Sequence, residues 1–150
     1  MRIQNILCPI DFSTNNDAAV TYASSLAQVF NARIHFVHAY EPAFAYSDVE
    51  AISVYSTPPD LDPIRQRLCD LRPTIDDVAF EHEVLFGFPG SVLLDYAKQH
   101  HIDVIVMATH GRSGLSRVLM GSVAETVMRH AECPVMTIKV PVPQPAETTT

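Results

Sequence analysis

One stretch of the sequence, residues 103–122, joins a continuous apolar run to a polar loop and then to a Gly-Ser pair. It reads Asp103-Val104-Ile105-Val106-Met107-Ala108-Thr109-His110-Gly111-Arg112-Ser113-Gly114-Leu115-Ser116-Arg117-Val118-Leu119-Met120-Gly121-Ser122. The apolar run does not alternate with polar residues, which predicts a strand covered on both faces. Gly121-Ser122 predicts the start of a helix.

Outward from this stretch, strand-like and helix-like segments alternate along the chain. Further strands are predicted at 6–10, 33–40, 78–86 and 134–140. Helices are predicted from an N-cap at Thr14 to a C-cap at Asn31, over 61–71, from Pro89, and from Gly121-Ser122. This order predicts one α/β domain over residues 1–140, with an open, mainly parallel five-stranded sheet and helices on both faces. Residues 41–60 are predicted to be a long loop, and 141–150 a disordered tail.

Composition excludes several classes of protein. Ten basic and seventeen acidic residues give a net charge of −7, so we expect no nucleic-acid partner. No apolar run approaches the ~20 residues of a membrane span. The three cysteines are an odd number without a CxxC spacing, which favours a reducing cytoplasm, and Cys8 is predicted to be a small core residue.

The histidines and glycines lack the common site motifs. The seven histidines form neither HxxxH nor HExxH, and the adjacent His100 and His101 diverge by about 100° on a helix, so no metal site is predicted. The spacing of the five glycines excludes GxGxxG and the P-loop. No catalytic set stands out, because the loop does not match GxSxG.

What remains is a candidate anion site. Gly111 would let the backbone approach a ligand, and Gly121 and Ser122 would present free N–H groups at the positive end of a helix. Ligands of open parallel sheets bind at the carboxyl ends of strands, which here also include Asp11. The open alternatives are an ordinary strand-loop-helix connection for the glycines and a turn-capping role for Asp11.

At these residues the chain resembles the universal stress protein family, from Ile3 to about Lys139. The resemblance rests on Ile6-Leu7-Cys8-Pro9-Ile10-Asp11-Phe12-Ser13, on residues 106–115 with 119–125, and on Cys133-Pro134-Val135. It implies a Rossmann-like sheet of order 3-2-1-4-5, a cytoplasmic role in stress survival, and a homodimer formed through strand 135–139. One branch of the family binds ATP through Gly-x-x-Gly, nine residues and Gly-Ser/Thr, and the other branch does not.

The resemblance also implies a set of nucleotide-binding residues. They are Pro9, Asp11, Ala39, Met107, Ala108, Gly111, Arg112, Gly121, Ser122, Val123 and Ala124. Pro9, Asp11 and Ala39 would lie near the adenine and ribose, and the others near the ribose and phosphates. The ligand would be ATP or another adenine nucleotide, with Mg²⁺ offsetting the acidic charge of the chain.

Ala108 stands where the ATP-binding branch has its first glycine. If that position needs a positive φ, alanine costs roughly 1–2 kcal/mol. If φ is ordinary, the methyl group costs nothing unless it meets a phosphate.

Two functions therefore remain. The first is a nucleotide-responsive dimeric module with at most weak ATP hydrolysis. The alternative is a nucleotide-independent dimeric interaction protein, with Phe44, Tyr46 and Tyr55 of the 41–60 loop as its candidate surface.

Overall fold

The chain folds as a strict alternation of strands and helices. The computed structural model describes residues 2–41, 60–109 and 120–140. Within them, in chain order, lie β1 (Asn5–Pro9), α1 (Asn16–Phe30), β2 (Arg33–Tyr40), α2 (Asp62–Cys69), β3 (Phe80–Phe86), α3 (Pro89–Gln99), β4 (Val104–Ala108), α4 (Ser122–His130) and β5 (Val135–Ile138). The predicted elements are all present, with ends shifted by a few residues. Most of the 41–60 loop and all of the 141–150 tail lie outside the described residues.

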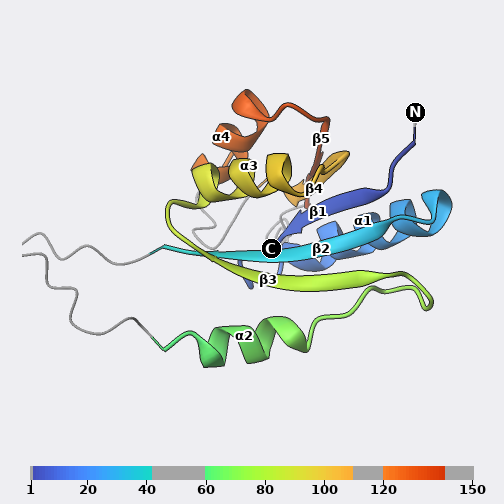
Figure 1. Ribbon diagram of the computed structural model, residues 1–150, viewed down its shortest axis with the longest axis horizontal. Helices are drawn as coiled ribbons and strands as arrows, with labels where there is room; N and C mark the ends of the chain where they lie inside the picture. The colour runs from blue at the N-terminus through green and yellow to red at the C-terminus, as the bar shows by residue number, and fades with distance from the viewer. Residues whose placement is uncertain (1, 42–59, 110–119, 141–150) are drawn as a thin grey trace, which may run out of the picture.

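The five strands form one parallel sheet in the order β3-β2-β1-β4-β5. β1 is central, with Ile6 beside Ile34 of β2 on one side and beside Val104 of β4 on the other. The predicted fold class is therefore confirmed. Strand order reverses at β1, since the chain moves from β1 to β2 and β3 on one side and to β4 and β5 on the other (Figure 1).

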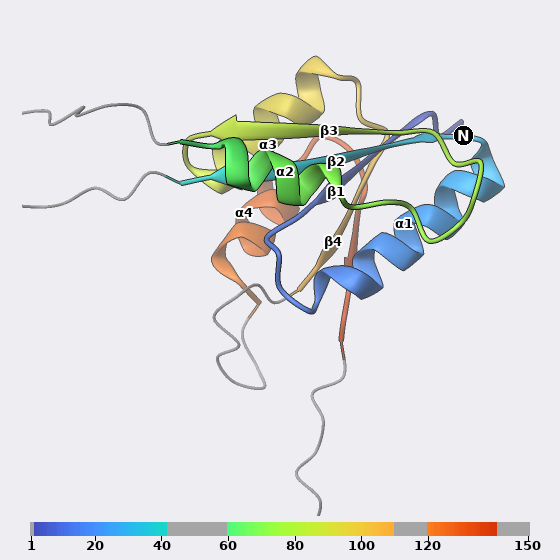
Figure 2. The same cartoon turned by 90° about the horizontal axis from the view of Figure 1, so that it is seen from below.

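Helices cover both faces of the sheet, and each face has its own core. α1 and α2 lie on one side and α3 and α4 on the other (Figures 1 and 2). Ile34 and Phe36 belong to the core under α1 and α2, whereas Val37 belongs to the core under α3 and α4. Successive side chains of a strand point to opposite faces, so His35 lies on the α3–α4 side with Val37.

The ends of α1 show one correct and one wrong prediction. Asn31 is the C-cap, with the left-handed φ of 52° that asparagine tolerates, as predicted. Thr14 is not the N-cap: that position is Asn15, which makes no side-chain capping bond. The preceding turn is instead held by Asn16, whose Oδ1 accepts the N–H of Asp11 at 2.9 Å.

Cys8 is the core residue that was predicted. It is fully buried in β1, and burial raises the pKa of its thiol to about 12. A thiol with such a pKa is inert at neutral pH. Among the described residues, no helix is long and apolar enough to cross a membrane.

Candidate functional site

A pocket opens at the carboxyl ends of the strands, where strand order reverses. Its volume is about 350 Å³, within the range of small-molecule sites. The ends of β1, β2 and β4 and the first turns of α3 and α4 supply its walls. This is the position at which open parallel sheets bind their ligands.

Nine of the eleven residues selected from the sequence line this one pocket. They are Pro9, Asp11, Ala39, Met107, Ala108, Gly121, Ser122, Val123 and Ala124. The other two, Gly111 and Arg112, lie outside the described residues. Residues from four separate elements and the turn after β1 therefore meet in a single cavity.

Asp11 occupies a tightly held turn after β1. Its Oδ1 accepts the N–H of Ser13 at 2.9 Å, so the turn-capping role does apply, and the residue also lines the pocket. The next residue, Phe12, has a φ of 62°, which is unfavourable for an aromatic residue. The Arg67 guanidinium lies 4.5 Å from the centre of the Phe12 ring. The centre of the His38 ring lies 4.7 Å from the same point. These contacts hold the strained turn in place.

The first turn of α4 lines the pocket with Ser122, Val123 and Ala124. We expected a free N–H at Gly121, and this is wrong: it donates to the Thr109 carbonyl at 2.9 Å. The first bond inside the helix runs from the N–H of Glu125 to the Gly121 carbonyl. The amides of Ser122, Val123 and Ala124 therefore have no intrahelical acceptor, and they stand at the positive end of the helix dipole. They are the donors available to an anion.

Ala108 carries no backbone strain. Among the described non-glycine residues, φ is positive only at Phe12, Asn31, Asp77 and His101. Ala108 is the last residue of β4 and pairs with Ile138 of β5. The 1–2 kcal/mol cost of a left-handed alanine therefore does not arise at this position.

The pocket combines apolar walls with acidic charge. Val37, Leu93 and Met107 are apolar and buried. Among the described lining residues, the charged side chains are Asp11 and Glu41, both acidic. The arrangement suits a ligand with a flat apolar ring, hydroxyl groups for a carboxylate, and an anionic end for the α4 amides.

Sequence reasoning missed several residues of this pocket. It concentrated on the ends of β1 and β4, but the cavity also uses His38 within β2, Glu41 after β2 and Pro89 at the start of α3. His38 donates its Nδ1–H to the Ile10 carbonyl at 2.7 Å. The missed signal was topological, since β2 pairs with β1 and must end beside it.

Comparison with known proteins finds relatives of this chain. The chain matches the Universal stress protein family over residues 2–139. A solved structure of the universal stress protein UspA from Lactobacillus plantarum is 30% identical with a TM-score of 0.70, covering 92% of this chain and 99% of its own.

Two similar structures were solved with nucleotides. One is a universal stress protein in complex with cAMP, 22% identical with a TM-score of 0.67, covering 93% of this chain and 98% of its own. The other is the universal stress protein from Archaeoglobus fulgidus in complex with dAMP, 20% identical with a TM-score of 0.65, covering 93% of this chain and 100% of its own.

Proposed function

Because the chain belongs to the universal stress protein family, we propose that it binds an adenine nucleotide, ATP or AMP, in the pocket at the carboxyl ends of β1 and β4. The observation that carries the proposal is the convergence of nine sequence-selected residues on one cavity. The similar proteins that were solved with cAMP and dAMP support the choice of an adenine ligand.

Each part of the nucleotide has a matching part of the pocket. The purine would lie against the apolar residues Val37, Ala39 and Met107. Asp11 would accept a ribose hydroxyl through Oδ2, since Oδ1 is bonded to Ser13. The phosphates would reach the α4 amides, together with Gly111 and Arg112.

A cation would accompany a triphosphate. The described lining residues contribute two carboxylates and no basic side chain, and the chain as a whole carries a net charge of −7. Mg²⁺ bound through phosphate oxygens would reduce the repulsion. We therefore expect ATP to bind more tightly with Mg²⁺ than without it.

The output of binding would be a signal rather than turnover. The pocket-lining histidine, His38, donates Nδ1–H to a backbone carbonyl, and no nucleophile-base pair lies among the described lining residues. We propose a nucleotide-responsive cytoplasmic module with at most weak ATP hydrolysis.

The proposed module is a homodimer through β5. β5 is an edge strand of the described sheet and Met136 in it is 38% exposed, so a second copy would pair along this strand. Sedimentation at micromolar concentration tests this part of the proposal. A monomer would contradict it.

A matched pair of valine variants tests the nucleotide site. Gly121→Val places a branched side chain at the helix start beside the α4 amides. Ser91→Val places the same side chain in the first turn of α3, on an exposed residue outside the pocket. Calorimetric titration with ATP and Mg²⁺ should show at least a ~10-fold loss for Gly121→Val, which is about 1.4 kcal/mol, and no loss for Ser91→Val. Full affinity in Gly121→Val would remove the phosphate site from this helix.

The nucleotide-independent alternative stays a prediction. Its proposed surface, including Phe44, Tyr46 and Tyr55, lies outside the described residues. A pull-down with a variant that lacks residues 44–56 would test this alternative. If the variant captures the same partners as the wild type, the loop is not the binding surface.

A further inference from the structure

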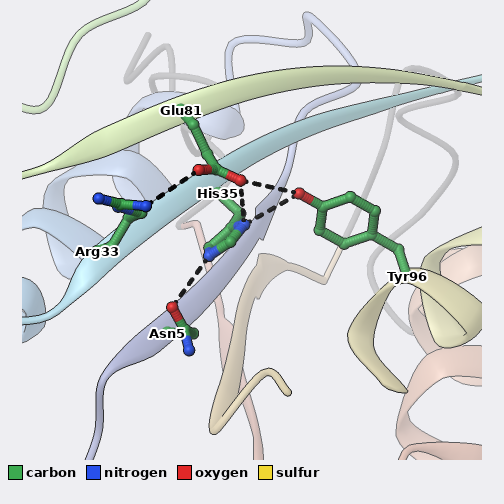
Figure 3. A network of polar contacts seen from close by, with 5 residues as sticks. All are labelled: Asn5, Arg33, His35, Glu81 and Tyr96. Carbon is green, nitrogen blue, oxygen red and sulfur yellow. Dashed lines mark hydrogen bonds and ion pairs between the residues drawn. The ribbon is translucent and has the colours of Figure 1, made fainter. Parts of the chain in front are cut away.

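A second cluster of polar side chains lies at the opposite end of the sheet from the nucleotide pocket. His35 of β2 and Glu81 of β3 are neighbours in the strand register, and Asn5 begins β1. Tyr96 lies on α3, and His100 is the C-cap of that helix. Figure 3 shows the side chains of Asn5, Glu81 and Tyr96 converging on the His35 ring.

The centre of the cluster is buried, and its outer side opens to solvent. His35 and Tyr96 are 4% and 5% exposed, whereas Glu81 is partly exposed and His100 is exposed. His35 Nδ1 lies 2.9 Å from Glu81 Oε1 and 3.0 Å from the Tyr96 hydroxyl oxygen. The Tyr96 hydroxyl also lies 3.4 Å from Glu81 Oε1. An ion could therefore enter from the surface and meet a preformed inner wall.

Around the His35 ring, the cluster contains several hydrogen-bond acceptors and few protons to share among them. His35 Nε2 lies 3.3 Å from Asn5 Oδ1, an acceptor, so a neutral ring protonated on Nε2 would donate to Asn5 and leave a lone pair on Nδ1. Nδ1 then points a lone pair at the Glu81 carboxylate, and the Tyr96 hydroxyl has one proton for both. In that tautomer, two acceptors 2.9 Å apart face one another, an arrangement that a bound cation would stabilise.

We propose that His35, Glu81 and His100 bind a divalent transition-metal ion, with Zn²⁺ the best match to their donor atoms. One ligand atom from each residue lies within 4.8 Å of the other two. Tetrahedral Zn²⁺ holds ligand atoms about 3.3 Å from one another. His35 Nδ1 and Glu81 Oε1 lie 2.9 Å apart and must separate slightly, whereas His100 must move closer to them. His100 is exposed and Glu81 is partly exposed, so these small adjustments take place on the surface side of the cluster.

The donor set selects among metals. Two imidazole nitrogens and one carboxylate, with a fourth position open, form a set that Zn²⁺ uses. Mg²⁺ and Ca²⁺ prefer oxygen ligands alone, which disfavours them here. Asn5 would be the outer partner that fixes the His35 tautomer with Nδ1 directed to the metal, a feature common to metal-bound histidines.

The remaining neighbours orient the ligands. The Tyr96 ring stacks on His100 with centroids 3.9 Å apart, which holds the imidazole over the cluster. Arg33 lies 3.4 Å from Glu81 Oε2, the oxygen away from His35. Its positive charge opposes the metal, but its side chain is 56% exposed and well screened. Glu83 adds negative charge near Tyr96.

Two adjacent histidines provide a matched test. The full chain, without an affinity tag, is stripped with a chelator and titrated with Zn²⁺ against a competing indicator, in the absence of nucleotide. We expect one Zn²⁺ per chain. His100→Asn should weaken affinity at least about 10-fold, and His101→Asn should leave it unchanged. Asparagine suits both positions, because His100 is a C-cap and His101 has a φ of 49°.

A spectroscopic signal separates this site from surface binding. On addition of Zn²⁺, the imidazole resonances of both His35 and His100 should shift in the proton NMR spectrum of the wild type. In His100→Asn, the His35 shift should be lost at the same Zn²⁺ concentration. Equal affinity in the wild type and His100→Asn, or Zn²⁺ binding without a His35 shift, would overturn the proposal. So would no binding at millimolar Zn²⁺.

Discussion

The two ends of the sheet use the same strands for opposite chemistry. At the carboxyl ends, β1 and β2 supply apolar walls, Asp11 follows β1, and α4 begins with amides that have no acceptor within the helix. At the amino ends, the same two strands supply Asn5 and His35, and α3 finishes at His100. The first end suits an anion with a flat ring, and the second suits a cation.

This difference follows from the parallel topology. In an alternating β-α chain, the carboxyl end of each strand leads to the amino end of a helix, where the dipole is positive. The amino ends of the strands lie beside helix carboxyl ends, where the dipole is negative. Ser122 lies at the positive start of α4, and His100 lies at the negative end of α3.

A core substitution should damage both ends together, with the largest effect. Phe36 is fully buried in β2 between the two ends, where its ring packs against Phe80 and His82. Phe36→Ala should lower the free energy of unfolding by about 3–5 kcal/mol, measured by urea denaturation. Phe86 ends β3 and is 51% exposed, so Phe86→Ala should lower the free energy of unfolding by well under that amount. Equal losses of unfolding free energy in the two variants would mean that the core around Phe36 does not support both ends of the sheet.

Site variants should separate the two ends. Asp11→Asn keeps the oxygen that accepts the Ser13 N–H but removes the charge proposed to bind ribose. It should weaken ATP binding at least about 10-fold, or ~1.4 kcal/mol, and leave Zn²⁺ affinity unchanged. His100→Asn should do the reverse. Titration of both variants with both ligands measures this, and a variant that weakens both would show that the ends are coupled.

Acid should act on the amino end through His35. Burial lowers its folded-state pKa, the nearby His100 and Arg33 add to this, and Glu81 opposes it. The unfolded chain binds the proton near pH 6.5, the ordinary histidine value, so this contribution to stability is present above pH 6.5 and decreases as the pH falls below it. An NMR titration of metal-free protein should give His35 a midpoint below 6.5. A midpoint above that value would contradict the account.

Sequence reasoning captured what depends on local pattern. A continuous apolar run identified the strand at 103–108, because buried parallel strands need apolar residues on both faces. The β-prone residues Ile34, Phe36 and Val37 identified the strand at 33–40. Asn31 was recognised as a C-cap because a left-handed turn selects asparagine. The strand order came from the family resemblance, and the structure has that order. Nine of the candidate residues line the pocket, although their ligand is still a proposal.

What failed depends on contacts between distant residues. Gly121 was expected to offer its N–H, but Thr109 accepts it, and nothing local predicts that bond. No metal site was predicted, since the search considered histidines close in sequence. His35 and His100 are far apart along the chain and meet only because α3 crosses back over β2. Predicting that cluster requires the β2–β3 register and the path of α3 across the sheet.

The central claim, an adenine nucleotide in the pocket, is tested most directly by what the protein carries. The protein is purified without added nucleotide and denatured, and any released small molecule is identified by mass spectrometry. The stripped protein is then titrated with ATP and Mg²⁺ in a calorimeter. We predict near-stoichiometric adenine nucleotide or binding at micromolar affinity. No nucleotide released and no heat at millimolar ATP would contradict the account.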